Sequence, residues 1–128
     1  MIDDYQKETE LRNAGHDEFW LETLTPSKLS RLWFEEIGEQ NMFDAIKENG
    51  EDEGDTQRIW LSNLNCMCNM YGHTDIMSAV ACKRTDGTNC VSIQVNSPTD
   101  SSTIWADIYD FDHQVADLIY DQIINYKK

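Results

Sequence analysis

The chain has 128 residues, of which 24 are acidic and 10 are basic, so its formal net charge at pH 7 is -14. A field of this sign repels phosphate groups, which argues against direct nucleic-acid binding and against adhesion to anionic membranes. No apolar run approaches the roughly 18 residues of a membrane span, and we expect residues 1–128 to form a single soluble domain.

The acidic residues are concentrated in the two flanks of the chain. Residues 1–55 carry 16 acids against 5 bases, residues 56–99 carry 2 against 3, and residues 100–128 carry 6 against 2. Because opposite charges steer association, flanks of this kind favour a basic partner.

The first ten residues, MIDDYQKETE, lack the basic and apolar regions of a secretory signal. A domain of this size does not depend on disulfides for its core. We therefore expect a cytoplasmic protein whose four cysteines are reduced.

Helical periodicity dominates the first half of the chain. Residues 1–14 and the stretch HDEFWLETL are predicted to form short helices, and Thr25 is a typical N-cap before a proline at the first helical position. We expect a helix over residues 26–37, ended by Gly38, and then a shorter helix that Gly50 stops. The apolar residues that define these two helices are Leu29, Leu32, Trp33, Ile37, Met42, Phe43 and Ile46.

Residues 48–55, ENGEDEGD, contain five acids and two glycines and are predicted to form an exposed loop. A calcium-binding EF-hand loop needs a glutamate at its twelfth position, where this chain has Ile59. We therefore predict no metal there.

Residues 56–71 fit two structures. As a helix they place Trp60, Leu64, Met67 and Tyr71 on one stripe, and as a strand they alternate cysteines with asparagines. Sixteen residues are long for one strand, so we favour the helix.

After residue 75 the apolar period changes to two, and Asp86-Gly87 between two such runs predicts a hairpin with a two-residue turn. This turn sets Cys82 opposite Val91 and sends Cys82 and Cys90 to opposite faces of the sheet. The predicted buried face consists of Val80, Cys82, Val91, Ile93 and Val95.

A turn at residues 96–102 leads to a third strand over residues 103–111, in which Ile104, Ala106 and Ile108 alternate with polar or aromatic residues. Asp112 is placed to cap a final helix. The predicted apolar stripe of this helix is Val115, Leu118, Ile119, Ile123 and Tyr126. The predicted fold is α+β: N-terminal helices, a small antiparallel β-meander and a C-terminal helix packed on the sheet.

The stretch CMCNMYGH, residues 66–73, raises the question of a metal site. Its Cys-x-Cys spacing followed by His73, Cys82 and Cys90 matches none of the common zinc frameworks. A catalytic thiol needs a nearby histidine and an electropositive setting, whereas this chain is acidic. We therefore assign the cysteines to apolar packing and predict no metal, no cofactor and no catalytic residue.

The leading functional hypothesis is an acidic inhibitor or interaction domain that binds a basic protein and occupies a nucleic-acid-binding or nuclease groove. Its expected contacts are Glu35, Glu36, Glu39, Glu51, Asp52, Glu53, Asp55, Asp117 and Asp121. The alternative is a small enzyme or ligand-binding domain with a pocket between sheet and helices, lined by Trp33, Trp60 and Trp105.

Overall fold

The computed structural model describes residues 2–68, 72–97 and 101–127, with the backbone alone at residues 63, 67, 68, 72 and 73. Within these ranges the helices are α1 (Asp4–Asn13), α2 (Glu18–Glu22), α3 (Pro26–Trp33), the π-helix η1 (Phe34–Gly38), α4 (Glu39–Asn49), the 3₁₀ turn η2 (Ile108–Asp110) and α5 (His113–Ile124). The strands are β1 (Glu51–Glu53), β2 (Thr56–Cys68), β3 (Gly72–Lys83), β4 (Asn89–Asn96) and β5 (Thr103–Asp107).

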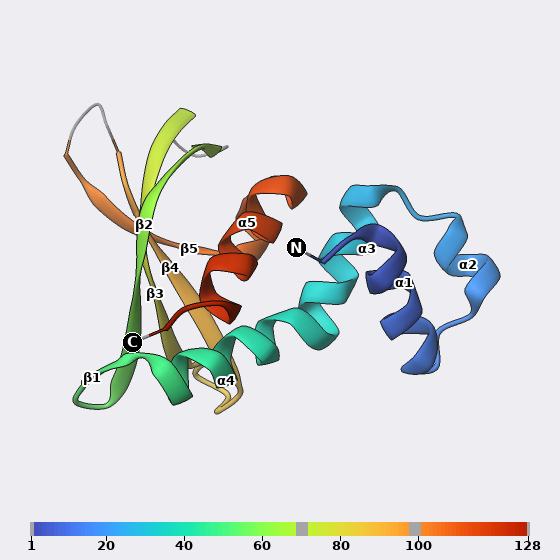
Figure 1. Cartoon of the computed structure of the whole chain (residues 1–128), viewed down its shortest axis with the longest axis horizontal. Helices are drawn as coiled ribbons and strands as arrows, with labels where there is room; N and C mark the ends of the chain where they lie inside the picture. The colour runs from blue at the N-terminus through green and yellow to red at the C-terminus, as the bar shows by residue number, and fades with distance from the viewer. Residues whose placement is uncertain (1, 69–71, 98–100, 128) are drawn as a thin grey trace.

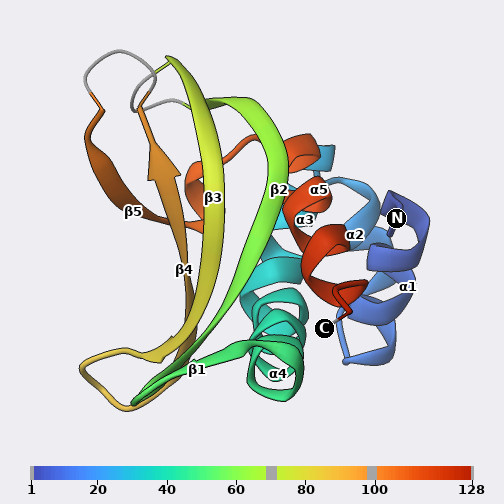
Figure 2. The same cartoon turned by 60° about the vertical axis from the view of Figure 1, so that its left-hand side comes forward.

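The strands form one antiparallel sheet in the order β1-β2-β3-β4-β5. Helices α4 and α5 pack against one face of this sheet, and α1, α2 and α3 lie beyond them at the far end of the molecule (Figure 1). Among the described residues no helix covers the opposite face (Figure 2). The predicted α+β fold, with its meander and its C-terminal helix on the sheet, is confirmed.

The first long helix begins as predicted, because the Thr25 side chain accepts a hydrogen bond from Lys28 N at 3.2 Å. The prediction that Gly38 ends it is wrong. The chain passes from α3 through η1 directly into α4, and the helix ends at Gly50, the stop that the sequence indicates. Gly38 is buried in this continuous helix because the rings of Trp33 and Phe34 occupy the space of a side chain.

Gly38→Ala tests this close approach. A Cβ at this position would lie 2.7 Å from Phe34 Cδ1 and 2.8 Å from Trp33 Cε3, so we expect a loss of about 1–3 kcal/mol in the free energy of unfolding. Glycine to alanine in an unobstructed helix would instead gain about 1 kcal/mol, so the sign of the change is diagnostic in urea unfolding. Lys47→Ala, exposed on the same helix, is the control and should change stability by less than about 0.5 kcal/mol.

Residues 56–68 form strand β2, so the favoured helix for this segment is wrong. A bulge between Trp60 and Leu64 shifts the register against β3. Ile59 and Leu61 face the core before the bulge, and Cys66 faces it afterwards, so the apolar residues change from odd to even positions. This change breaks the period of two and explains why the sequence pattern was ambiguous.

The β3–β4 hairpin is found where predicted, but its turn has three residues, 85–87, and not two. Arg84 N donates to Thr88 O at 2.8 Å, and Gly87 takes the left-handed conformation with φ of 88°. The register therefore differs by one residue, and Cys82 lies opposite Cys90 on the same face. On β3 the core face is formed by Ala79 and Ala81, not by the predicted Val80 and Cys82.

The acidic segment is not a loop throughout. Residues Glu51–Glu53 form the edge strand β1, which pairs with the start of β2 across a turn at Gly54 and Asp55. Gly54 has φ of 78°, a conformation that glycine adopts without steric cost. The expected exposure is nevertheless correct, because every residue from Glu51 to Asp55 is exposed.

The third predicted strand ends earlier than expected, at Asp107, because residues 108–110 turn into η2. Asp112 caps α5 as predicted by accepting a hydrogen bond from Gln114 N at 2.9 Å. On α5 the predicted apolar stripe is confirmed at Ile119 and Ile123, which are fully buried. Leu118 of the same predicted stripe is 40 % exposed. Residues 98–100 of the predicted turn lie outside the described residues.

A buried ion pair joins the N-terminal helices to α5. Lys7 of α1 is fully buried and donates to Asp117 Oδ1 at 2.6 Å and to Ser30 Oγ at 3.0 Å. Its ammonium also lies 5.8 Å from the ring centre of Trp33 and 5.6 Å from that of Phe34. Burial raises the pKa of the Asp117 carboxyl, and the hydrogen bond from Lys7 opposes this rise.

Asp117→Asn should lower the free energy of unfolding by about 3 kcal/mol, because it leaves the Lys7 ammonium buried without its counter-ion. Urea unfolding measures the loss. The double variant Lys7→Met with Asp117→Asn should be more stable than the single variant, since no buried charge remains. Glu35→Gln in the exposed Arg31–Glu35 pair is the control, with a change below about 0.5 kcal/mol. An unchanged Asp117→Asn variant would show that the pair is dispensable.

Candidate partner-binding surface

Two of the predicted contact residues are buried inside the protein. The Asp117 side chain is 11 % exposed and pairs with Lys7, and the Glu39 side chain is 8 % exposed and pairs with Arg84 at 2.7 Å. Glu39 also accepts a hydrogen bond from the Tyr109 hydroxyl at 3.2 Å. Burial, followed by the charge of Glu39, raises the pKa of Tyr109. These two carboxylates hold helices to the rest of the fold and present little surface to a partner.

Two other predicted contacts are exposed but already paired on the helical part of the molecule. Glu35 accepts from Arg31 Nε at 3.2 Å, one helical turn away. Glu36 lies 2.6 Å from His16 Nε2. Both pairs are accessible to water, so they contribute little to stability.

The predicted contacts in the acidic segment lie together on the β1 hairpin. Glu51 accepts from the indole N–H of Trp60 at 3.2 Å, and Glu53 accepts from Arg58 Nε at 2.9 Å. The side chains of Asp52 and Asp55 are exposed and make no hydrogen bond or ion pair with other described residues. This hairpin therefore presents the densest group of accessible carboxylates among the predicted contacts.

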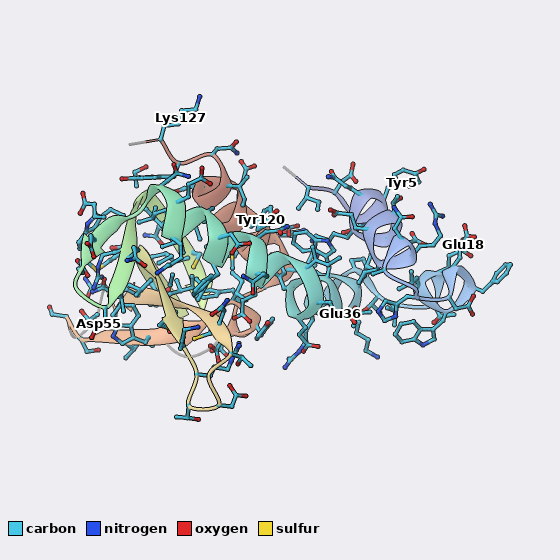
Figure 3. All side chains as sticks on the ribbon, turned by 90° about the horizontal axis from the view of Figure 1, so that it is seen from below. Tyr5, Glu18, Glu36, Asp55, Tyr120 and Lys127 are labelled. Atoms are coloured by element: carbon cyan, nitrogen blue, oxygen red, sulfur yellow. The ribbon has the colours of Figure 1, made fainter. Side chains whose placement is uncertain are left out.

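The remaining predicted contact, Asp121, lies half-buried on α5 and accepts from Asn125 Nδ2 at 3.1 Å. The acids at the two ends of the molecule are well separated. Asp55 lies at one end, and Glu18 and Tyr5 lie at the other, with Glu36 and Tyr120 between them (Figure 3). The predicted acids thus do not form one continuous surface.

Arg58 organises the uncovered face of the sheet next to this hairpin. Its Nε contacts both oxygens of Glu53 at 2.9 Å. Its Nη1 donates to Ser78 Oγ at 2.8 Å and to Gln94 Oε1 at 2.6 Å. Charged hydrogen bonds of this kind are stronger than neutral ones, so the guanidinium is fixed across three strands.

Two tryptophans flank the Arg58 guanidinium. Its central carbon lies 5.1 Å from the ring centre of Trp60 and 5.5 Å from that of Trp105, within the range of cation–π attraction. The two rings are 47 % and 49 % exposed. Register explains their alignment, because Trp60 pairs with Ser78, Ser78 with Gln94, and Gln94 with Trp105. We call Arg58, Trp60 and Trp105 the Trp–Arg–Trp cluster.

The sequence pattern does not predict this cluster as a unit. The predicted cleft lined by Trp33, Trp60 and Trp105 together is wrong. Trp33 is fully buried in the core on the helical side, whereas Trp60 and Trp105 lie on the open face. One signal was present in the sequence: Arg58 stands two residues before Trp60. Side chains at this spacing share one face of a strand but not one face of a helix.

Hollows of ligand size lie among the described residues between sheet and helices, where the ligand pocket is predicted. One, between β2 and α5, is lined by Trp60, Leu61, Asp121 and Tyr126 among others, and its volume is about 490 Å³. Another, between α4 and β3, has a volume of about 370 Å³. Both volumes fall within the roughly 300–1,000 Å³ of typical ligand pockets, and neither lining includes Trp33 or Trp105.

The cysteines of the possible metal site are separated in the structure. Cys66 is buried, with its sulfur 3.7 Å from Thr74 Oγ1, and Cys82 pairs with Cys90 elsewhere in the sheet. The side chains of Cys68 and His73 lie outside the described ones. Among the described residues no group of three or more His, Cys, Asp or Glu side chains could hold a metal ion. None of the helices in those ranges is long and apolar enough to cross a membrane.

Comparison with protein-family models, with curated proteins and with solved structures finds no match to this chain.

Arg58→Lys tests whether the guanidinium holds the open face together. Lysine cannot reach Glu53, Ser78 and Gln94 at once, so we expect a loss of about 1–3 kcal/mol in the free energy of unfolding. The matched control is Arg31→Lys, whose side chain is 64 % exposed and should change stability by less than about 0.5 kcal/mol. Equal stability of the two variants in urea would contradict the organising role of Arg58.

Proposed function

We propose that this protein is an acidic interaction domain that binds a basic partner protein through the open face of its sheet. The observation that carries the proposal is the position of the Trp–Arg–Trp cluster beside the exposed carboxylates of the β1 hairpin. Tryptophan and arginine are the residue types most enriched at the centres of protein interfaces. The β1 carboxylates would form the charged rim of the same surface.

The charges favour a basic partner over other classes of protein. With a net charge of -14, the chain attracts cationic surfaces over distances comparable to the screening length, about 8 Å at physiological salt. Steering of this kind mainly raises the association rate, while buried aromatic anchors slow dissociation. The two features together give fast and durable binding.

We further propose that the partner is a nucleic-acid-binding protein or a nuclease, and that binding blocks its groove. Such grooves gather lysine and arginine side chains that neutralise phosphates. The carboxylates at 51–53 and 55 would take the place of phosphates, and the indole rings would take the place of stacked bases. Binding would then inhibit the partner, because the protein would occupy the groove that normally holds nucleic acid.

The buried carboxylates Glu39 and Asp117 are not part of the proposed contact surface, because their internal partners occupy them. Glu35, Glu36 and Asp121 lie on helices and are secondary contacts in this proposal.

Asp52→Lys with Asp55→Lys is the direct test. Neither carboxylate has a described partner, so the fold should persist, while affinity for the basic partner should fall more than tenfold. The chain of 128 residues is used as bait in a lysate of the source cells, and the protein recovered is then purified and titrated by calorimetry. Affinity of the wild-type chain should also fall steeply between about 0.1 M and 1 M ionic strength, where the screening length shortens from about 10 to 3 Å.

Glu8→Lys with Glu22→Lys is the matched control, because it changes the net charge equally on α1 and α2 at the other end of the molecule. This control should retain binding within a few-fold. An equal loss of affinity in both double variants would mean that binding depends only on the total charge of the protein. Unchanged binding in the Asp52 and Asp55 variant, or recovery of a partner that is not basic, would reject the proposal.

A further inference from the structure

Two cysteines face each other across the β3–β4 hairpin. Cys82 and Cys90 are directly opposed in the strand register, and their sulfur atoms are 3.0 Å apart. Cys82 Sγ also lies 3.5 Å from Ser92 Oγ, the next side chain on the same face of β4. The pair is therefore already in contact with both thiols reduced.

We propose that Cys82 and Cys90 form a dithiol site that reacts with low-molecular-weight disulfides, such as glutathione disulfide, to close a cross-strand disulfide. This inference does not rest on the proposed function, since it uses neither the acidic hairpin nor the Trp–Arg–Trp cluster. The sequence-based register, which placed the two cysteines on opposite faces, excluded such a reaction.

The bond requires a local approach of the two strands. Arg84 N donates to Thr88 O, so Cys82 and Cys90, two positions further along each strand, form a hydrogen-bonded pair. The Cα atoms of such a pair are about 5.5 Å apart, within the range of about 4.4–6.8 Å that disulfides span. Opposed Cβ atoms are about 4.5–5.5 Å apart, with hydrogen-bonded pairs at the wide end, whereas a disulfide holds them about 3.5–4.5 Å apart. The Cβ atoms and the sulfur atoms, which are 3.0 Å apart, must therefore each approach by roughly 1 Å.

The reaction is two successive thiol–disulfide exchanges. The Cys82 thiolate attacks one sulfur of glutathione disulfide, which forms a mixed disulfide and expels one glutathione thiolate. The Cys90 thiol then loses its proton to solvent and attacks the Cys82 sulfur, expelling the second glutathione. Both cysteines are oxidised, and one glutathione disulfide is reduced to two molecules of glutathione.

Exposure sets the order of the two steps. Cys82 is partly exposed, whereas Cys90 is 8 % exposed. Burial and the hydrogen bond to Cys82 raise the pKa of Cys90 to about 12, and the charge of Arg84 opposes this rise. Cys82 is therefore the thiol that meets the reagent. The second step should become faster as the pH rises, because the attacking species is the Cys90 thiolate.

Cys66 is not part of this site. It lies opposite Thr74, eight residues before Cys82 on β3, which corresponds to roughly 26 Å along the strand. Its sulfur is buried in the core. Cys66→Ser is therefore the matched control for a cysteine removed from the same sheet.

The test uses the wild-type chain, folded and at neutral pH, incubated with excess glutathione disulfide and then blocked with a thiol reagent. Trypsin together with a protease that cleaves before aspartate separates residues 75–83, which contain Cys82 alone, from residues 86–99, which contain Cys90 alone. We expect these peptides to be joined in non-reducing mass spectrometry, two hydrogens lighter than their sum, and separated by reductant.

Two variants distinguish the steps. Cys90→Ser should accumulate one glutathione on Cys82, and Cys66→Ser should form the joined peptide at the wild-type rate. Absence of the joined peptide in the folded wild-type chain, with formation in the urea-unfolded chain, would overturn the proposal. So would a bond from either cysteine to residues 59–74, which contain the other two cysteines.

Discussion

The structure depends on one constraint: the described helices that pack on the five-stranded sheet all lie on one of its faces. The covered face is apolar and is filled by residues such as Ile59, Ala79, Val91 and Ile93. The other face must be stable in contact with water, and Arg58 meets this requirement by bonding across the strands while two indole rings lie over its guanidinium. The same arrangement that satisfies an open face leaves aromatic surface available for a partner.

Local signals in the sequence predicted the fold well where they act within a few residues. Thr25 before a proline and Asp112 before the last helix each cap a helix through their own side chain, so the boundary is encoded beside it. Gly38 shows the limit of such signals. Its role is set by the rings of Trp33 and Phe34 around a π-helical turn, a packing effect that helix-breaking rules do not contain.

The sheet was predicted less completely because one inserted residue reverses the inward and outward positions of a strand. The bulge in β2 has this effect after Trp60, and the third turn residue has it between β3 and β4. A simple alternation of apolar and polar residues in the sequence reveals neither the bulge nor the third turn residue. The errors at Cys82 and Cys90 and in the helix favoured for residues 56–71 share this origin.

The acidic composition predicted exposed carboxylates on the β1 hairpin but could not show which acids are buried. Glu39 pairs with Arg84, which is 45 residues away in the sequence. Asp117 pairs with Lys7, which is 110 residues away. Partners so distant in sequence are brought together only by the tertiary fold. The Trp–Arg–Trp cluster escaped prediction for the same reason, because its members come from β2 and β5, which are separated by two strands.

The short acidic strand β1 also has a consequence for how the molecule behaves among its own copies. It is the terminal strand of the sheet, and unpaired backbone groups at such an edge can template the addition of a strand from another chain. Three consecutive carboxylates on a three-residue strand make that addition unfavourable, since a second copy would bring the same charges into register. The charges of β1 thus oppose strand addition by another copy at this edge of the sheet.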